Sequence, residues 1–404
     1  MVPRAREALV GAAIALGCAW ALAGCGSGHE SGDPPSSVKR VLDVSYGSAG
    51  QVVLPDDVST IAVAPDGSVF VGSVRAIEKL DASGRSVWMT YAAPGYWLAS
   101  DASANVYTAV FTGVYKFNEQ GPDLSYGASG VASVFALTRD NNRFVSLVPL
   151  RDGTLYVMGH RVRYDDTGDA AIWIVKLAPD GSAMTSFGNG GRLDFQPVKS
   201  TWPGDIAVDN DGNLYVSFAN ATQNVTMGVA KFDRDGKSVA SFGNAGIWSG
   251  SRTRCHAWKP AVDSSGFVWV AGECTDASGA FSEALVKLDA NGRPVPEFGN
   301  AGYLDGFLGP VANKSAESIA LRIVIAPEGS MYLNGYVVVA GCAQRWLVAL
   351  DSQGKRIPSF GTDGTMLGVW SVALDAANRL YVASVAPNCP AADQKFTAVL
   401  SRYL

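Results

Sequence analysis

One short pattern recurs seven times along this 404-residue chain, and it restricts the possible folds more than any other feature. Each copy is an apolar strand, a tight polar turn and a second strand rich in Val and Tyr, as in IAVAPDGSVFVGS (61–73). The turn centres are Gly67, Ala104, Gly153, Gly212, Gly266, Gly329 and Asn378, and they follow one another at separations of 37, 49, 59, 54, 63 and 49 residues. Such a period predicts a repeat architecture in which each copy is one supersecondary unit.

A second unit alternates with the first. KFDRDGKSV (231–239), which continues into SFGNAG (241–246), is a representative copy. Asp-Gly and Asn-Gly pairs supply the positive φ that tight hairpin turns require, and the flanking apolar alternation supplies a buried face. Each period therefore carries four strands. Seven four-stranded antiparallel sheets predict an all-β chain folded as a seven-bladed β-propeller, with no helix after residue 25.

The two ends of the repeat region complement each other. The last copy stops at AVLSRYL (398–404) without the SFGxxG segment, whereas SYGSAGQVVL (45–54) carries such a segment near the other end. We therefore expect the N-terminal segment to be the outermost strand of the last blade, because sharing a blade between both termini leaves no unpaired seam. The alternative is a stray strand followed by six or seven repeats that do not close.

Composition agrees with a large β-rich core. The 45 Gly residues are about 11% of the chain, against roughly 7% in average proteins, as many tight turns would require. A hydrophobic content of 48% is enough for a sizeable core and excludes global disorder. The net charge is −5 and no basic run follows the first few residues, which argues against a nucleic-acid partner.

The N-terminus has the pattern of an export signal. Arg4 and Arg6 precede an apolar run at 8–23, which is shorter than the roughly 20 residues of a membrane-spanning helix. The following Leu22-Ala23-Gly24-Cys25 resembles the bacterial lipobox. This resemblance implies cleavage before Cys25 and acylation of its thiol. An ordinary secretory signal with an incidental Cys is the alternative.

These features predict three regions: a lipoprotein signal peptide (1–24), a lipidated Cys25 with a flexible tether (25–40), and the propeller domain (41–404). The tether is expected to be flexible because residues 26–37 are rich in Gly, Ser and Pro. The lipobox resemblance implies an exported protein that is attached to the membrane of the cell envelope by its N-terminal lipid. Since Gly26 stands where the sorting rule of bacterial lipoproteins uses Asp for retention in the inner membrane, the outer membrane is the expected location.

The repeats also resemble a known group. KLAPDGSAMTSFGNGG (176–191) is similar to the delta-60 repeat, whose pattern is roughly L-x-P-D-G-S-x-D-x-S-F-G-x-x-G, and the repeats resemble NHL-like propeller repeats as well. The resemblance covers residues 41–404 and implies a fold without a general activity. The first two blades depart from it, because TYAAPG (90–95) lacks the FG pair and Ala104 replaces a turn Gly.

The up-and-down strand order predicts where binding residues gather. All short turns fall at one end of the propeller and all long connections at the other, and long irregular loops on a rigid scaffold commonly carry binding residues. Trp and Arg are favoured interface anchors. The candidate residues near the long connections are Trp202, Arg252, Arg254, His256, Trp258, Arg345, Trp346 and His160. The alternative for Trp258 and Trp346 is that they only cover blade edges.

The cysteines suggest disulfides near the same end. Four of the six Cys remain after loss of Cys18 with the signal peptide and lipidation of Cys25. An even number in an exported protein favours disulfides. We expect the pairs Cys255–Cys274 and Cys342–Cys389, because each joins adjacent loops at one end of the propeller. A zinc site would need CxxC-type spacing or nearby His.

Catalytic signatures are scarce. The chain has three His residues and none of the GxSxG, HExxH or GxxxxGK[ST] motifs, so we predict no catalytic, metal-binding or cofactor-binding residues and no cofactor. DNDGN (209–213) lacks the Glu of a calcium loop and is interpreted as a hairpin turn. The leading hypothesis is a monomeric, non-enzymatic lipoprotein that binds a protein or glycan partner. The alternative is an envelope lyase or hydrolase with a metal in the central channel, which three or more converging carboxylates or imidazoles would favour.

Overall fold

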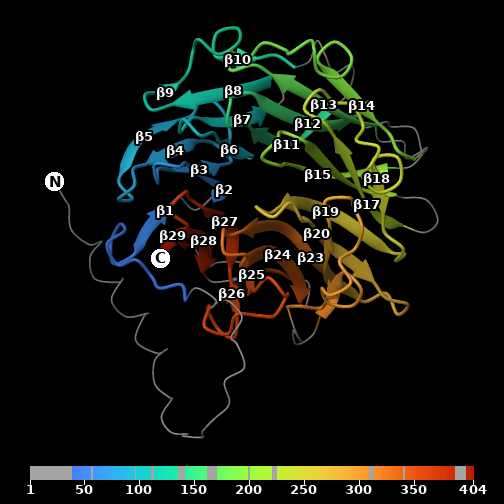
Figure 1. The fold of residues 1–404 in the computed structure, drawn as a ribbon. Helices are drawn as coiled ribbons and strands as arrows, with labels where there is room; N and C mark the ends of the chain where they lie inside the picture. Colours follow the sequence, from blue (N-terminus) through green and yellow to red (C-terminus); the bar gives the residue numbers. More distant parts are fainter. Residues whose placement is uncertain are drawn as a thin grey trace, which may run out of the picture. The chain divides into compact units, whose positions relative to one another are not determined.

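The structure, a computed structural model, describes residues 39–55, 58–95, 97–110, 113–134, 142–161, 171–198, 201–220, 225–308, 314–339, 342–386 and 397–404. They form seven antiparallel sheets arranged as the blades of a propeller, as predicted (Figure 1). The described residues contain no helix, and accordingly no helix long and apolar enough to cross a membrane.

The blades are numbered here in chain order. Blade 1 consists of β2 (Val58–Val63), β3 (Val69–Ser73), β4 (Ile77–Leu80) and β5 (Ser86–Thr90). Blade 2 consists of β6 (Leu98–Ser100), β7 (Val106–Val110), β8 (Gly113–Asn118), β9 (Gly121–Pro122) and β10 (Val131–Ala132). Blade 3 consists of β11 (Asn142–Pro149), β12 (Leu155–Arg161), β13 (Ala171–Leu177) and β14 (Arg192–Phe195).

Blade 4 consists of β15 (Thr201–Val208), β16 (Leu214–Asn220), β17 (Thr226–Phe232) and β18 (Ile247–Ser249). Blade 5 consists of β19 (Cys255–Val262), β20 (Val268–Thr275), β21 (Phe281–Leu288) and β22 (Tyr303–Asp305). Blade 6 consists of β23 (Lys314–Ile325), β24 (Met331–Val339), β25 (Cys342–Leu350) and β26 (Thr365–Leu367). Blade 7 consists of β27 (Val369–Leu374), β28 (Leu380–Ala386), β29 (Thr397–Tyr403) and the N-terminal β1 (Gln51–Leu54).

The hairpin turns form where the Asp-Gly and Asn-Gly chemistry predicts them. All seven turn centres have positive φ, including the two that are not Gly, Ala104 (59°) and Asn378 (62°). In DNDGN the Asp209 carboxylate accepts the backbone N–H groups of Asp211 and Asn213 at 3.0 and 2.9 Å. The Asp209 carboxylate therefore closes a hairpin turn, as predicted for this segment.

The FGxxG segments join neighbouring blades. In blade 4, Phe242 packs edge-on against Tyr215 of the same blade, with ring centroids 5.9 Å apart. The N–H of Gly243 then donates to the carbonyl of Asn291 in blade 5 at 2.7 Å. Gly243 has a φ of 58°, and a Cβ there would lie 2.2 Å from the carbonyl oxygen of Ile247, so only Gly fits. The same backbone bond links Gly188 to Asp235 between blades 3 and 4.

The core lies between the blades. Each sheet is buried on both faces, so that one apolar cluster combines Trp269 and Leu285 of blade 5 with Leu333 and Trp346 of blade 6. The first strand of each blade is innermost, and these seven strands contact one another in sequence around the propeller axis. The axis is therefore surrounded by β2, β6, β11, β15, β19, β23 and β27.

The ring closes as predicted. β1 pairs with β29 in antiparallel register from Gln51↔Ser401 to Leu54↔Ala398, so the N-terminal strand is the outermost strand of blade 7 (Figure 1). A buried ion pair supports the seam, with Arg402 Nη2 2.6 Å from Asp43 Oδ2. Burial raises the pKa of Asp43, but hydrogen bonds from Ser45 and Arg402 outweigh this effect and the pKa is lowered.

We predict that Asp43→Asn lowers the free energy of unfolding by about 3 kcal/mol at pH 7, because it leaves the Arg402 charge buried without its counterion. A lowered pKa in the folded state means that the Asp43 contribution is complete above its unfolded pKa and lost as the pH falls through the folded value. The difference in thermal stability between the wild type and the variant should therefore persist at neutral pH and shrink below about pH 4. Thermal melts across this range measure it.

Asp194→Asn is the matched control, because Asp194 forms an exposed ion pair with Arg192 on β14. This substitution should cost less than about 1 kcal/mol. Equal destabilisation by the two substitutions would contradict the role given to the buried seam.

Candidate functional site

The strand order places the two kinds of connection at opposite ends, as predicted. The turns between the first and second strands of the blades, and the turns that follow the third strands, lie at one end of the propeller. This end is here called the turn end. The longer connections lie at the other, here called the long-loop end. Several of these connections fall outside the described residues, but those of blade 5, at 250–254 and 276–280, are described in full.

A β-bulge recurs at one position of the inner strands. In six of the seven blades the register between the first and second strands shifts at this bulge, for example between Val58 and Thr60 in β2 and between Ala257 and Lys259 in β19. A bulge turns the following side chain to a new direction. A polar residue stands at or directly after each of these six bulges: Ser146 in blade 3, and Thr60, Asp205, Lys259, Arg322 and Ser371 in the other blades. The last five interact with one another and are here called the axial ring.

Arg322 shows that these side chains meet at the axis. Its Nη1 donates to Thr60 Oγ1 at 3.2 Å and to Ser371 Oγ at 3.1 Å. Arg322 is in blade 6 whereas Thr60 is in blade 1, so the guanidinium reaches past blade 7. Burial lowers the pKa of Arg322, and the negative charge of Asp205 in blade 4 partly opposes this shift. Arg322 keeps its charge, because an Arg guanidinium is not deprotonated in proteins.

Lys259 and Asp205 form the second half of the axial ring. Lys259 Nζ lies 2.7 Å from Asp205 Oδ2, and the side chains are 24% and 23% exposed, so solvent reaches the pair. The other carboxylate oxygen accepts the N–H of Ile206 at 2.6 Å, which holds the carboxylate in place. The axial ring therefore carries two cations, one carboxylate and two hydroxyls.

Three aromatic side chains line the long-loop end of β15 and β19. The His256 ring lies 4.8 Å from Trp202 and 6.0 Å from Trp258 by centroid distance, and these three residues are here called the aromatic rim. Trp202 is 44% exposed, whereas Trp258 is the bulge residue of β19 and is half-buried. Burial lowers the pKa of His256, so this imidazole favours its neutral form more than an exposed one.

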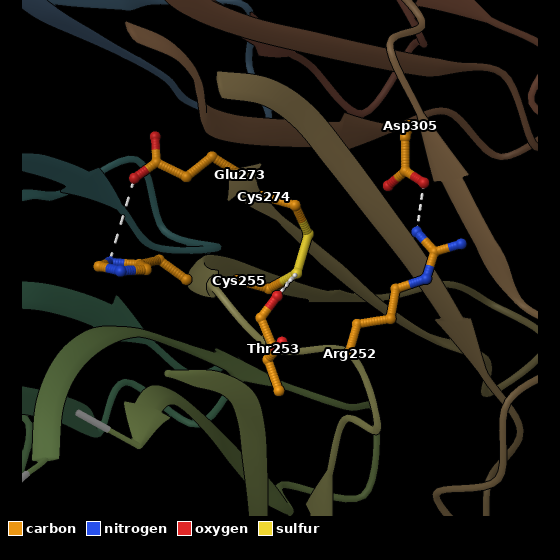
Figure 2. The surroundings of a disulfide bond; sticks show 7 residues. Arg252, Thr253, Cys255, Glu273, Cys274 and Asp305 are labelled. Carbon is orange, nitrogen blue, oxygen red and sulfur yellow. Dashed lines mark hydrogen bonds and ion pairs between the residues drawn. A yellow bond between two sulfur atoms is a disulfide. The ribbon is translucent and has the colours of Figure 1, made fainter. Parts of the chain in front are cut away.

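Buried Glu273 stands behind the aromatic rim. Its Oε1 is 4.0 Å from His256 Nδ1, and the two residues are cross-strand partners in β19 and β20 (Figure 2). Glu273 itself is paired across β20 and β21 with buried Glu283, whose Oε1 accepts the N–H of Leu308 at 2.6 Å. The rim is thus supported by a polar layer inside blade 5.

Arg252 and Arg254 are held at the edge of blade 5. Arg252 pairs with Asp305 and its guanidinium lies 4.4 Å from the ring centroid of Tyr303 (Figure 2). Exposed Arg254 has a φ of 60°, and its Nη1 donates to the carbonyl of Asp276 at 2.9 Å. Arg252 is therefore held against β22, the outermost strand of blade 5, and Arg254 against the connection at 276–280.

Arg345 belongs to a different cluster. Its guanidinium lies 4.5 Å from the Trp370 ring centroid and 5.3 Å from that of Tyr336. Trp370 is the bulge residue of β27, as Trp258 is of β19, so the two indoles occupy equivalent positions in blades 7 and 5. Burial lowers the pKa of Arg345.

Two of the residues predicted for the binding surface, Trp346 and His160, are not part of the aromatic rim as defined above. Trp346 is fully buried and packs edge-on against Phe307, 6.2 Å away, so it is not part of an exposed binding surface, and its assignment to a binding face is corrected here. The reason is its place on β25, where the side chain points between blades 5 and 6. His160 lies on β12 of blade 3 and has no described contact with the rim residues of blades 4 and 5.

One predicted disulfide is present. Cys255 and Cys274 face each other across β19 and β20 with a Cα–Cα distance of 4.1 Å, and their sulfur atoms are bonded (Figure 2). Cys342 is also disulfide-bonded. Its expected partner Cys389 lies outside the described residues, as does Cys25, so that pairing and the lipidation stay predictions.

The axial ring was missed from the sequence, although a signal for it exists. Each member stands seven residues before the turn centre of its blade, as Thr60 stands before Gly67 and Arg322 before Gly329. Alignment of the repeats on their turn centres would have placed these residues in one column. Alternation alone cannot find them, because the bulge shifts the period of two by one residue.

The described residues contain no group of three or more His, Cys, Asp or Glu side chains that could hold a metal ion. Asp205 is the single carboxylate of the axial ring, and Lys259 is bound to it. The ring is therefore cationic, which is the opposite of what a divalent cation requires.

No protein-family model and no curated protein matches the chain. Several solved structures are similar to this chain over most of its length. A gluconolactonase from Xanthomonas campestris is 14% identical, with 91% of this chain and 96% of that chain covered and a TM-score of 0.39. A glucose dehydrogenase is 10% identical, with 87% and 99% covered and a TM-score of 0.40. A protein of unknown function from Dyadobacter fermentans is 8% identical, with 88% and 97% covered and a TM-score of 0.44. Similarity at this level does not bear on what this chain binds or catalyses.

We predict that replacing both Cys255 and Cys274 by Ser lowers the free energy of unfolding by about 3 kcal/mol, because the disulfide closes a loop of 19 residues. Thermal melts of the double variant against the wild type measure this change. Peptide mapping without reductant should recover the two cysteines in one linked peptide. Free thiols at both positions in protein purified without reductant would contradict the bond.

Proposed function

We propose that this protein is a lipid-anchored envelope protein that binds a protein partner through the long-loop end of blades 4 and 5. The observation that carries the proposal is the aromatic rim, where Trp202 remains 44% exposed beside two further aromatic rings. Arg252 and Arg254 lie in the connection that leads into β19, the strand that carries His256 and Trp258. Trp and Arg are the residues that most often contribute the energy of protein interfaces.

Rigidity supports binding at this place. The disulfide fixes β19 to β20 directly behind the rim, and the bulge at Trp258 is part of the β-ladder. Arg254 is held by its bond to Asp276. A surface whose side chains are already ordered loses less entropy on association, so more of the contact energy becomes affinity.

The start of the described chain suggests how the protein faces its membrane. Arg40 Nε donates to the Tyr332 hydroxyl at 2.7 Å and Nη2 donates to Asn378 Oδ1 at 3.0 Å. Asn378 and the Arg40 ion-pair partner Glu328 lie in hairpin turns of blades 7 and 6, at the turn end. A tether that begins at Cys25 would thus enter the propeller from the turn end.

A lipid on Cys25 would then keep the turn end near the membrane. If the 13 residues 26–38, which are rich in Gly, Ser and Pro, behave as a random coil, their root-mean-square span is roughly 20 Å. The long-loop end would face away from the membrane and remain open to partners. The proposal needs no catalytic centre, and the metal-dependent enzyme considered as its alternative finds no ligand set in the described residues.

We predict that Trp202→Ala and Arg254→Ala each reduce recovery of the partner by about tenfold or more, as expected for a loss of at least 1.4 kcal/mol at an interface anchor. The measurement is quantitative mass spectrometry of proteins cross-linked to the tagged protein in the native envelope. Tyr91→Ala is the matched control, since Tyr91 is an exposed aromatic residue after β5 at the same end but in blade 1. Equal recovery by all three variants would refute the rim as the interface.

We also predict that an alkyne-tagged fatty acid labels the wild type but not Cys25→Ala. For the orientation, a fluorophore attached at Ala290→Cys in a blade 5 turn is compared with one at Ser251→Cys in the preceding long connection. In vesicles that carry the acylated protein, a quencher on lipid headgroups should act more strongly on the Ala290 position. Stronger quenching at Ser251 would reverse the proposed orientation.

A further inference from the structure

We propose that the axial ring is a binding site for a small hydroxylated carboxylate, whose carboxylate group is held by Arg322. This site does not depend on the proposed partner surface, although Trp258 of the aromatic rim directly precedes Lys259 of the axial ring in sequence. It is built by inner strands of blades 1, 4, 5, 6 and 7, whereas the aromatic rim lies toward the ends of β15 and β19.

The Arg322 guanidinium is anchored through one of its three nitrogens. Its Nη1 uses two bonds, to Thr60 Oγ1 and Ser371 Oγ. Ser371 Oγ is in turn held by the N–H of Ile61 at 3.3 Å. No hydrogen bond from Nε or Nη2 is formed within the described part of the chain. These two nitrogens present parallel N–H groups, which is the arrangement that binds a carboxylate through both oxygens.

The charges around Arg322 favour the binding of an anion. Arg322 and Lys259 outnumber the single carboxylate of Asp205, and that carboxylate is already 2.7 Å from Lys259. Arg345 lies close enough for its positive charge to act on Arg322 as well. Placing cations in a partly buried site without counterions is unfavourable, and a bound monoanion would remove this cost.

A neighbouring amide favours a ligand that also carries hydroxyl groups. Asn334 is the cross-strand partner of Arg322 and is almost completely buried. Its Nδ2 donates to the carbonyl of Trp370 at 3.2 Å, whereas its Oδ1 has no hydrogen-bond partner among the described residues. Buried polar atoms are seldom left without a partner. A ligand hydroxyl could donate a hydrogen bond to Asn334 Oδ1 and so satisfy this acceptor.

Two Trp residues are sequence neighbours of axial-ring members. Trp258 and Trp370 directly precede Lys259 and Ser371 in their strands, at equivalent bulges of blades 5 and 7. Apolar walls with a few placed polar groups are typical of small-molecule sites. A uronate combines the three features, since it has a carboxylate, several hydroxyls and a ring with apolar C–H faces. Its single negative charge also equals the excess positive charge of the axial ring.

The test measures binding of D-galacturonate by isothermal titration calorimetry, with its uncharged methyl ester and inorganic phosphate as comparison probes. The wild type should bind galacturonate at least tenfold more tightly than the methyl ester and more tightly than phosphate. Arg322→Met should weaken galacturonate binding by at least tenfold, whereas Arg85→Met, which removes an exposed Arg in a blade 1 turn, should not change it. Thermal melts and the Cys255–Cys274 bond confirm that each variant is folded.

Two further variants keep the proposal testable if Arg322→Met does not fold. Lys259→Met removes a positive charge and should weaken binding severalfold. Asp205→Asn removes the competing carboxylate and should strengthen binding severalfold, an effect that damage to the fold would not produce. Absence of galacturonate binding by the wild type, equal binding of acid and ester, preference for phosphate, or weaker binding by Asp205→Asn would each overturn the proposal.

Discussion

Closure of the ring is the constraint on which the other features depend. Six of the blades are continuous in sequence, but blade 7 exists only because β1 completes it beside β29. The Asp43–Arg402 pair then ties the N-terminal segment to β29, and the backbone bond from Gly47 to the Ser83 carbonyl joins blade 7 to blade 1. An open arc would leave two sheet faces exposed and would let the inner strands drift apart. The bonds from Arg322 to Thr60 and Ser371 span three blades, so they need the closed ring.

The sequence was informative wherever one local chemistry recurs. Turn centres such as Ala104 and Asn378 were identified by their place in the repeat, although neither is Gly, and both have the positive φ that the turn requires. The Cys255–Cys274 bond was predicted because both residues precede or follow neighbouring strands of one blade. The sequence did not show that Trp346 is buried between two sheets whereas Trp258 belongs to the aromatic rim. Both stand a few residues from a long connection, but Trp346 occupies a regular position between two sheets, whereas Trp258 sits on a bulge.

The two ends of the propeller use their polar residues differently. At the turn end, Asp carboxylates accept hydrogen bonds from backbone N–H groups and hydroxyls of their own turns. Asp81, for example, accepts bonds from the Ser83 hydroxyl and from the N–H of Arg85, which lower its pKa. Such carboxylates stabilise hairpins and are poor ligands for anything else. Among the described connections of the long-loop end, the one at 276–280 also contains such a turn, in which Asp276 accepts the N–H groups of Ser278 and Ala280. The described connections at 74–76 and 250–254 contain no Asp.

This division explains why the net charge is a poor guide to ligands. The chain has a net charge of −5, yet its axial ring has more cations than carboxylates. Many of the Asp carboxylates lie in hairpin turns, where they accept hydrogen bonds from the backbone. An anion at the axis would therefore be attracted by nearby groups and not by the protein as a whole. Interactions over a few ångströms in a partly buried site are screened by salt much less than interactions between exposed charges. Binding at the axial ring should accordingly depend weakly on ionic strength, whereas a partner attracted by exposed Arg254 should associate more slowly as salt increases.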